Sequence, residues 1–318
     1  MEQSSKPIPS HFSDFLDWLE IEKGLSSKSQ ENYARFLKKF LDWLKINNLE
    51  NLKPHELTPE YVRKYRLFLS RQYLSNTKQP LKKSTQRYYL IALRSLLNYF
   101  TDRDILSLPT EKIKLARDKS EREVRFLTVE QLEKLFSAPD TSTVQGLRDR
   151  SILEVLFSTG MRIAELVALN REQFKLKSGM KELELSIIGK GGRIRPVYFS
   201  EHALIWLRKY LETRQDKEKA LFINYRSKKE APRRLTPRSI EKKIKKYAIL
   251  AGMPLTITPH VMRHSFSVDL LSQGVDIRTL QEFLGHKSIL ATQIYAHVTS
   301  KRLREIHRKF HSGRKLKI

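Results

Sequence analysis

Residues 182–199 read ELELSIIGKGGRIRPVYF, and this stretch decides the fold class of the second half of the chain. Apolar and polar residues alternate on both sides of the glycine-rich run 189–192, a pattern typical of two short antiparallel strands joined by a tight turn. Lys190 lies at the tip of that turn. The other patterned segments have helical spacing, so we predict a mainly helical protein with one small antiparallel β section.

Helical segments flank the predicted hairpin on both sides. Residues 128–131 (TVEQ) form a capping box that opens one helix, and residues 148–157 continue as another. Further helices are expected to begin at Ser200, at Thr236 and after Thr258. The last of these regions divides into four short helices, separated at Gly274, Gly285 and Thr299.

The first part of the chain is predicted to be wholly helical. Apolar residues at helical spacing begin at Phe12 and stop at Gly24, and a second run follows Ser29. Thr58 and Pro59 open a third helix. Ser84 is expected to cap a fourth, with inward-facing residues that are Tyr88, Leu93, Leu96, Leu97 and Phe100.

A charged stretch with few apolar residues and a proline separates the two parts. We therefore expect a helical domain over residues 1–106, a linker over 107–125 and a second domain over 126–318. The sequence shows no internal repeat of useful length.

Charge and composition exclude several classes of protein. The 318 residues include 61 Lys and Arg against 35 Asp and Glu, a net charge of +26, and no cysteine. Disulfide-stapled secreted modules and thiolate metal sites are thereby excluded. No apolar run reaches the length of a membrane span, and the N-terminus does not resemble a signal peptide, so we expect a cytoplasmic protein without membrane association. The charge favours nucleic acid as the polyanionic partner.

The candidates for contact with a DNA backbone are basic residues near the start of the fourth helix and between Arg226 and Lys246. The alternative is that these residues form ordinary solvated helix faces. These candidates are Lys82, Lys83, Arg87, Arg94, Arg233, Arg234, Arg238 and Lys242.

Motifs for nucleotide and metal binding are missing. The glycines at 189–192 lie in a hairpin and not between a strand and a helix, which disfavours a phosphate loop. His260 and His264 are four residues apart, but Val261 stands where a metalloprotease needs Glu. We expect neither a metal nor a cofactor.

Several strongly polar residues lie in apolar surroundings. Arg162 and Glu165 occur in residues 159–166 (TGMRIAEL), and His260 and Arg263 are one helical turn apart. Each residue alone has an ordinary structural explanation, as do His286 at the end of a helix and Tyr295 nine residues later.

Together these residue types suit metal-free phosphoryl transfer. Two arginines can hold the non-bridging oxygens of a phosphodiester and neutralise the charge of a five-coordinate transition state. A tyrosine can attack phosphorus, a histidine can take the phenolic proton, and a lysine on the hairpin can protonate the departing 5′ oxygen.

The ordered series resembles the tyrosine recombinases, the phage integrase family, over essentially the whole chain. It is most similar to the Xer recombinases, in the segments 159–166 and 189–193 and in the stretch YAHVTSKRLREIH that begins at Tyr295. The resemblance implies an N-terminal four-helix, SAM-like core-binding domain followed by a tyrosine recombinase catalytic domain.

The resemblance also assigns roles to residues. Arg162 and Arg263 match the arginines that clamp the phosphate, Lys190 the general acid and His260 the histidine linked to general-base work. The remaining matches are His286 on the scissile phosphate, Tyr295 as nucleophile and Glu165 as an orienting acid. His264 and His297 match no catalytic position and are expected to be structural. Lys190 is preferred to Arg193 because the family's lysine is the first after the turn glycine.

The implied activity is site-specific recombination of double-stranded DNA through a 3′-phosphotyrosyl intermediate and a Holliday junction. Partners implied are a homotetramer, or a heterotetramer with a second recombinase, and a DNA translocase of the FtsK type. A role in chromosome or plasmid dimer resolution, and so in chromosome partition at cell division, is expected. Leu303, Ile306 and Phe310 give the C-terminal helix an apolar stripe for docking on a neighbouring protomer, or for packing back on its own domain.

Three alternatives remain open at this point. An integrase of a mobile element shares the mechanism, although an additional arm-binding domain is not evident before the first helix. A type IB topoisomerase uses the same tyrosine chemistry but rejoins the same strand. A catalytically silent DNA-binding regulator has no use for the complete polar set.

Overall fold

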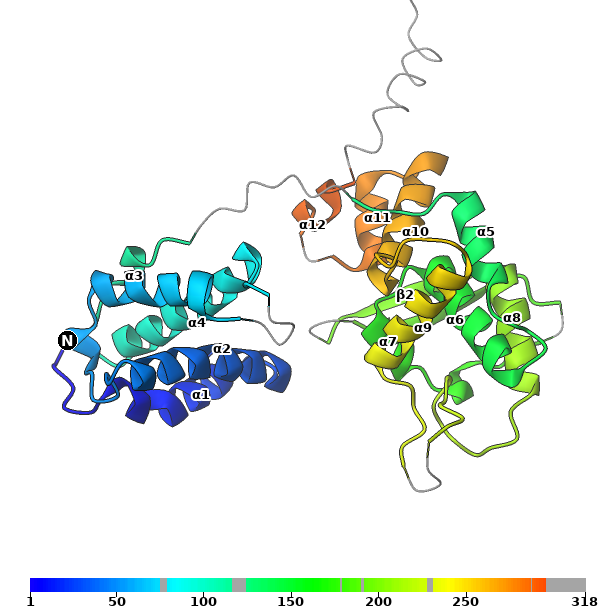
Figure 1. The fold of residues 1–318 in the computed structure, drawn as a ribbon. Helices are drawn as coiled ribbons and strands as arrows, with labels where there is room; N and C mark the ends of the chain where they lie inside the picture. Colours follow the sequence, from blue (N-terminus) through cyan, green and yellow to red (C-terminus); the bar gives the residue numbers. More distant parts are fainter. Residues whose placement is uncertain are drawn as a thin grey trace, which may run out of the picture. The chain divides into compact units, whose positions relative to one another are not determined.

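The computed structural model describes residues 1–74, 79–115, 124–177, 179–189, 192–227, 231–286 and 288–295. Two compact units divide the chain, Met1–Glu121 and Arg122–Ile318 (Figure 1). Each unit has an apolar core of its own, so each is described by itself.

Four longer helices build the first unit, with one-turn helices between them. The longer helices are α1 (Phe12–Ile21), α2 (Ser27–Ile46), α3 (Pro59–Leu67) and α4 (Lys83–Asp102). The short ones are η1 (Ile8–His11), η2 (Pro54–Glu56), the π-type turn η3 (Phe68–Gln72) and η4 (Thr110–Lys112). Aromatic rings fill the core between them; those of Phe40 on α2 and Tyr65 on α3 lie 5.0 Å apart.

The prediction of four helices here is confirmed, with two corrections on α4. Ser84 does not cap it: the helix begins at Lys83, and Lys82 occupies the N-cap without a side-chain hydrogen bond. Tyr88 does not face inward, since it is 56% exposed while Tyr89 is 8% exposed. The helical repeat alone could not choose between adjacent tyrosines, because both lie near the edge of the buried face.

Over its described residues, the second unit is mainly helical and contains one two-stranded sheet. Its elements are α5 (Val129–Ser137), α6 (Val144–Thr159), α7 (Ile163–Ala168), η5 (Arg171–Gln173), β1 (Leu183–Ile188), β2 (Ile194–Phe199), α8 (Glu201–Glu212), α9 (Pro237–Leu250), α10 (Pro259–Gln273), α11 (Ile277–Leu284) and α12 (Leu290–Gln293). The fourth short helix predicted after Thr299 falls outside the described residues.

Side-chain caps fix the starts of four of these helices as the sequence predicts. The hydroxyls of Thr128, Ser200, Thr236 and Thr258 accept backbone N–H bonds at the N-termini of α5, α8, α9 and α10. Each cap satisfies a backbone donor that the helix itself leaves unpaired.

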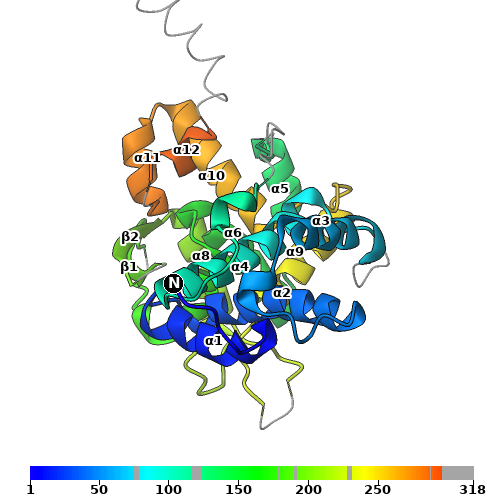
Figure 2. The same ribbon diagram turned by 90° about the vertical axis from the view of Figure 1, so that its left-hand side faces the viewer.

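The predicted hairpin is confirmed. Strands β1 and β2 pair antiparallel in a register that runs from Leu183 opposite Phe199 to Ile188 opposite Ile194. Along β2 the buried positions alternate, and Arg195 shares the inner face with Val197 and Phe199. Figure 2 shows the hairpin beside the lower end of α11.

Helix α6 runs through the middle of the second unit and packs on α8, α10 and β2. It carries a buried charge cluster as well as apolar residues. Arg148 pairs with Asp149 and donates to the Ile223 carbonyl at 2.7 Å. Asp149 in turn accepts from Lys243 at 3.0 Å and from Tyr247 at 2.8 Å, which joins α6 to α9.

Candidate active site

Arg162 precedes α7, and Glu165 in the first turn of that helix holds it. One carboxylate oxygen of Glu165 accepts the Arg162 backbone N–H at 2.7 Å, and the other lies 3.1 Å from the Arg162 guanidinium. Glu165 also accepts from Arg195 on β2 at 2.7 Å. The buried carboxylate of Glu165 therefore caps the start of α7, holds the half-buried Arg162 side chain and binds the hairpin through Arg195.

Arg195 was missed by the sequence analysis, yet it links two parts of the site. Its side chain is buried, and its second terminal nitrogen donates to the Phe283 carbonyl at 2.9 Å, near the end of α11. The signal was present in the alternation of β2, where a charged residue falls on the apolar face.

Arg263 on α10 is 3% exposed and binds the ends of two other helices. It donates to the Gly160 carbonyl at 2.5 Å and to the Leu284 carbonyl at 2.6 Å. These residues lie at the C-termini of α6 and α11, where the helix dipole favours a cation. The loop from α6 to α7 and the end of α11 are thus held at one guanidinium.

His286 follows the left-handed residue Gly285 that ends α11 (φ +61°). Its Nε2 lies 3.1 Å from an Arg263 nitrogen, and its Nδ1 lies 2.9 Å from the Thr292 hydroxyl on α12. Because the Arg263 nitrogen can only donate, Nε2 accepts and Nδ1 carries the proton toward Thr292.

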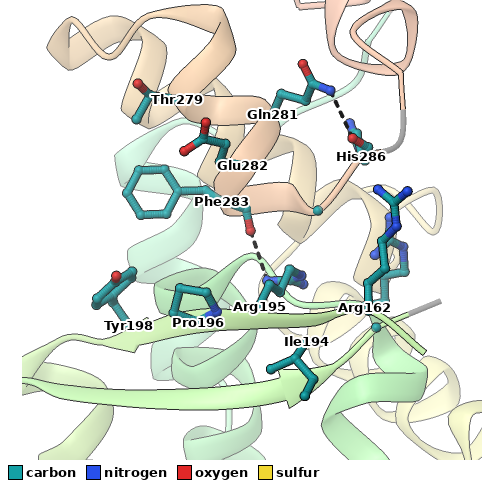
Figure 3. A pocket seen from close by; sticks show the side chains of 13 residues that line it. Arg162, Ile194, Arg195, Pro196, Tyr198, Thr279, Gln281, Glu282, Phe283 and His286 are labelled. Atoms are coloured by element: carbon teal, nitrogen blue, oxygen red, sulfur yellow. Dashed lines mark hydrogen bonds between the residues drawn. The ribbon is translucent and has the colours of Figure 1, made fainter. Parts of the chain in front are cut away.

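An open cavity of about 420 Å³ lies between β2 and α11. Figure 3 shows Arg162 and His286 at one end of its lining, with Arg195 beneath the end of α11. The dashed lines in that view mark the Arg195 bond to Phe283 and a bond of 3.0 Å from the Gln281 amide to the His286 carbonyl. The cavity presents cationic donors to an anionic ligand.

Tyr295 lies in a small apolar cluster with residues of α10 and α11, and it is 1% exposed. The side chain that meets its hydroxyl is His264, whose Nδ1 lies 2.6 Å from Oη. His260, the predicted base, is exposed and stacks edge-on against His264 with ring centroids 4.3 Å apart. The purely structural role expected for His264 therefore overlooked its bond to the candidate nucleophile.

Burial and the clustered arginines keep these histidines neutral. Burial, then Arg263 and Arg162, lower the pKa of His286 to about 4. Burial, then His260 and Arg263, lower the pKa of His264 to about 4. Partial burial of the ring, then Arg263 and Arg162, lower the pKa of His260. Burial raises the pKa of the Tyr295 phenol, so it is protonated at neutral pH.

Two family sequence models match the chain. The model of the Phage integrase family matches residues 125–302, and that of the phage integrase N-terminal SAM-like domain matches residues 12–104. The chain belongs to the phage integrase family. It is a site-specific tyrosine recombinase, with a SAM-like helical unit ahead of the catalytic one.

Curated relatives of this recombinase align over nearly its whole length. Tyrosine recombinase XerC of Pelotomaculum thermopropionicum is 33% identical over 313 residues, covering 95% of this chain and 97% of the relative. Tyrosine recombinase XerD of Vibrio cholerae is 30% identical over 315 residues, covering 98% and 99%. The likeness to Xer enzymes noted in the sequence is thus confirmed.

Solved structures show the same fold. A crystal structure of XerH site-specific recombinase bound to palindromic difH substrate, in a post-cleavage complex, matches with a TM-score of 0.73 and 22% identity, covering 96% of this chain and 97% of that one. The Tn1549 transposon integrase in complex with circular intermediate DNA matches with a TM-score of 0.66 and 17% identity, covering 95% and 99%.

Some predicted site residues of this recombinase lie outside the described residues. These are Lys190, His297 and the apolar stripe Leu303, Ile306 and Phe310. Within the described residues, no helix is long and apolar enough to cross a membrane. The described part of the chain also contains no group of three or more His, Asp and Glu residues placed to hold a metal ion.

The basic candidates divide into free-standing and internally bonded side chains. Lys82, Lys83 and Arg87 are exposed at the start of α4, where Arg94 is half-buried; Arg238 and Lys242 are exposed on α9, with Arg233 half-buried before it. Arg234 is different, because its guanidinium donates to the Val167 and Leu169 carbonyls at 2.6 and 2.9 Å and to Asn170. Arg234 therefore stabilises the end of α7 and the residues that follow it, and its contact with a DNA backbone stays a prediction.

Proposed function

We propose that this recombinase exchanges DNA strands at a specific site by forming a 3′-phosphotyrosyl intermediate on Tyr295. The convergence of Arg162, Arg263 and His286 at the ends of α6 and α11 supports the proposal. The three groups come from separate elements of the catalytic unit, and a phosphodiester is the ligand that suits two guanidiniums and a nearby imidazole.

The proposed cleavage step conserves atoms and charge. The Tyr295 oxygen attacks phosphorus while the bond from phosphorus to the 5′ oxygen breaks. The phenolic proton passes to His260, and Lys190 gives a proton to the departing 5′ oxygen. Attack by the 5′ hydroxyl of a partner duplex reverses these steps, and a second round on the other strands passes through a Holliday junction.

The electrostatics of the site favour transfer of the phenolic proton to His260 after DNA has bound. Burial first, and then Arg263 and Arg162, lower the pKa of His260 and His286, which favours neutral imidazoles in the DNA-free protein. A phosphate anion beside the same arginines offsets their charge and raises the basicity of the histidines. The substrate thus activates the base at the moment of attack.

Full-length similarity to Xer enzymes supports dimer resolution as the biological role, on two sites held by a homotetramer or by a heterotetramer with a second recombinase. Duplex DNA is the partner, as in the XerH complex with difH substrate. A DNA translocase of the FtsK type is the proposed activator.

A nicked suicide substrate tests the chemistry. The parent protein is expected to form a covalent protein–DNA adduct, and Tyr295→Phe is expected to bind the same DNA without forming one. Lys190→Ala is expected to slow cleavage and to be rescued by a 5′-bridging phosphorothiolate, whose leaving group needs no proton. An adduct formed by Tyr295→Phe would remove Tyr295 as nucleophile, and absence of rescue would leave Lys190 as a phosphate contact.

Strand exchange separates recombination from same-strand religation. Two site-bearing duplexes of different length are expected to yield recombinant lengths, whereas a topoisomerase would return only the parental ones. Mapping covalent adducts on genomic DNA then distinguishes roles: adducts near the chromosome terminus favour dimer resolution, and adducts inside a mobile element favour integration.

A further inference from the structure

The bond between His264 and Tyr295 has no place in the proposed cleavage step. Both side chains are buried, with Tyr295 1% and His264 9% exposed, and Nδ1 and Oη are 2.6 Å apart. The Tyr295 ring also packs against apolar residues of α10 and α11. The nucleophile is therefore held at a distance from solvent by its bond to His264, by the buried Ser267 side chain beside its hydroxyl and by a small apolar cluster.

We infer that His264 is a positioning residue that restrains the Tyr295 hydroxyl in a buried resting position until DNA is bound. The inference rests on the proposed function, since it concerns the tyrosine assigned there as the nucleophile. It gives a second histidine of α10 a role distinct from that of His260.

Solvent access shows that the buried position of Tyr295 is a resting position and not the position from which it attacks phosphorus. A phosphodiester within duplex DNA approaches from solvent, and Arg162 and His286 line the open cavity it would meet. Because the Tyr295 ring is enclosed in the apolar cluster and the residue is 1% exposed, its hydroxyl must move toward solvent to reach phosphorus. Leaving breaks the bond to His264, so that bond stabilises the resting state and not the transition state.

The protonation state of His264 suits this restraint. Burial, then His260 and Arg263, lower its pKa to about 4, so the ring is neutral at pH 7 and has one acceptor nitrogen. A protonated phenol donates to that acceptor. The charged groups that face His264 are Arg263, on the same helix, and the titratable ring of His260.

A second contact ties the tyrosine segment to the phosphate-binding groups. Thr292, three residues before Tyr295, is fully buried and accepts from His286 Nδ1 at 2.9 Å, while Nε2 of the same ring accepts from Arg263. A phosphate that competes for Arg263 and His286 disturbs this arrangement. DNA binding thereby loosens the contact that holds α12 at Thr292, while the bond to His264 holds Tyr295 just after that helix.

Chemical labelling of tyrosines in the DNA-free, full-length protein tests the restraint. Tetranitromethane is the probe, and peptide mass spectrometry follows each tyrosine separately. Tyr198, which is 43% exposed, and Tyr210, which is 0% exposed, are internal references within the same unit. In the parent protein Tyr295 is expected to react as slowly as Tyr210.

Two substitutions of His264 separate hydrogen bonding from packing. His264→Phe keeps an aromatic ring but removes the acceptor, and it is expected to raise Tyr295 labelling by about fivefold, the population change expected for one hydrogen bond. His264→Asn places an amide oxygen near the former Nδ1 and is expected to keep labelling within about twofold of the parent. If His264→Phe does not fold, His264→Leu takes its place.

The rate of adduct formation on bound DNA is a second measurement, and a purely structural role of His264 predicts no increase in that rate. At saturating nicked duplex, His264→Phe is expected to form adduct about fivefold faster than the parent, with unchanged DNA affinity. Unchanged Tyr295 labelling, equal increases at Tyr295 and Tyr210, or adduct formation slowed with labelling unchanged would each overturn the inference. Adducts on Tyr295→Phe would instead overturn the proposed function, which the labelling does not test.

Discussion

Glu165 binds two guanidinium groups and a backbone N–H at once, so its loss would release Arg162, Arg195 and the start of α7 together. Glu165→Gln keeps an oxygen acceptor but removes the negative charge between Arg162 and Arg195. We expect Arg162 to lose its fixed position, which slows adduct formation by about 100-fold. Unfolding free energy is expected to fall by about 1–3 kcal/mol.

The measurement is single-turnover adduct formation at saturating DNA, with a denaturant titration alongside. Glu172→Gln, an exposed position in the same unit, is the matched control and is expected to change neither value. Equal activity of the two variants would show that Glu165 does not orient Arg162.

Histidine titration at the site also predicts how stability depends on pH. The pKa values of His264 and His286 are about 4 in the folded state, below the ordinary value of 6.5. Between these values the unfolded chain binds more protons than the folded one, so stability is complete above pH 6.5 and falls as pH decreases toward 4.

Thermal unfolding at a series of pH values from 7.5 to 4.5 is the test of this titration, and the melting temperature is expected to fall across that window. His264→Asn is expected to flatten the decrease, and His202→Asn, at an exposed histidine on α8, is expected to leave it unchanged. A melting temperature that rises on acidification would contradict the assignment.

Among the elements, the end of α11 approaches β2 closely because Gly285 has no side chain, which leaves room for Arg195. Gly285 has φ +61°, and a Cβ atom there would lie 2.5 Å from Arg195 Cδ. Gly285→Ala therefore combines backbone strain with displacement of Arg195 from Phe283 and Glu165. We expect a loss of about 2–3 kcal/mol of unfolding free energy and slower adduct formation.

Gly252 offers a control that separates backbone strain from the displacement of Arg195. Its φ is +68°, but a Cβ atom there would meet nothing within 4 Å. Gly252→Ala is expected to lose only the strain energy, about 1 kcal/mol, and to retain adduct formation. Equal losses at both glycines would show that the approach of Arg195 is unimportant.

Elements were more predictable from the sequence than their contacts. Capping hydroxyls and the glycine turn are local signals, so the helix starts at Thr128 and Thr258 and the hairpin followed from a few residues each. The start of α4 has no capping side chain, and Ser84 was chosen wrongly for that reason.

The site was predictable as a set of residues but not as a set of bonds. Arg162, Arg263 and His286 do come together, as the family resemblance implied. Which histidine of α10 meets Tyr295 depends on how the residues after α12 lie against α10, and helical spacing does not carry that information. The partners of Arg195 are Glu165 and the Phe283 carbonyl, far apart in the sequence, so spacing within the hairpin could not assign its role.

At the scale of the whole molecule, the net charge of +26 predicts salt-sensitive DNA affinity. Lys82 and Lys83 are exposed at the start of α4 and are proposed to contact phosphates. Replacing both by Gln is expected to weaken binding and to reduce the slope of log affinity against log salt by about 1.8, at about 0.9 for each lost contact.

Affinity measured from 50 to 200 mM salt checks this slope. Lys45→Gln, at an exposed lysine near the end of α2, is the charge-matched control and is expected to leave the slope nearly unchanged. If Lys45 and Lys82 variants behave alike, affinity reflects overall charge and not the start of α4.

The crowding of Arg162, Arg195 and Arg263 around Glu165 has a consequence for how such an enzyme changes over generations. Repulsion among these cations is present in the DNA-free folded chain, and a phosphate offsets it only while DNA is bound. Arg162→Gln relieves part of it while Arg195 still pairs with Glu165, so we expect calorimetry to show a melting temperature higher by roughly 2–4 °C. Selection for folding alone would then favour the inactive form, and only selection for strand exchange would retain the arginine.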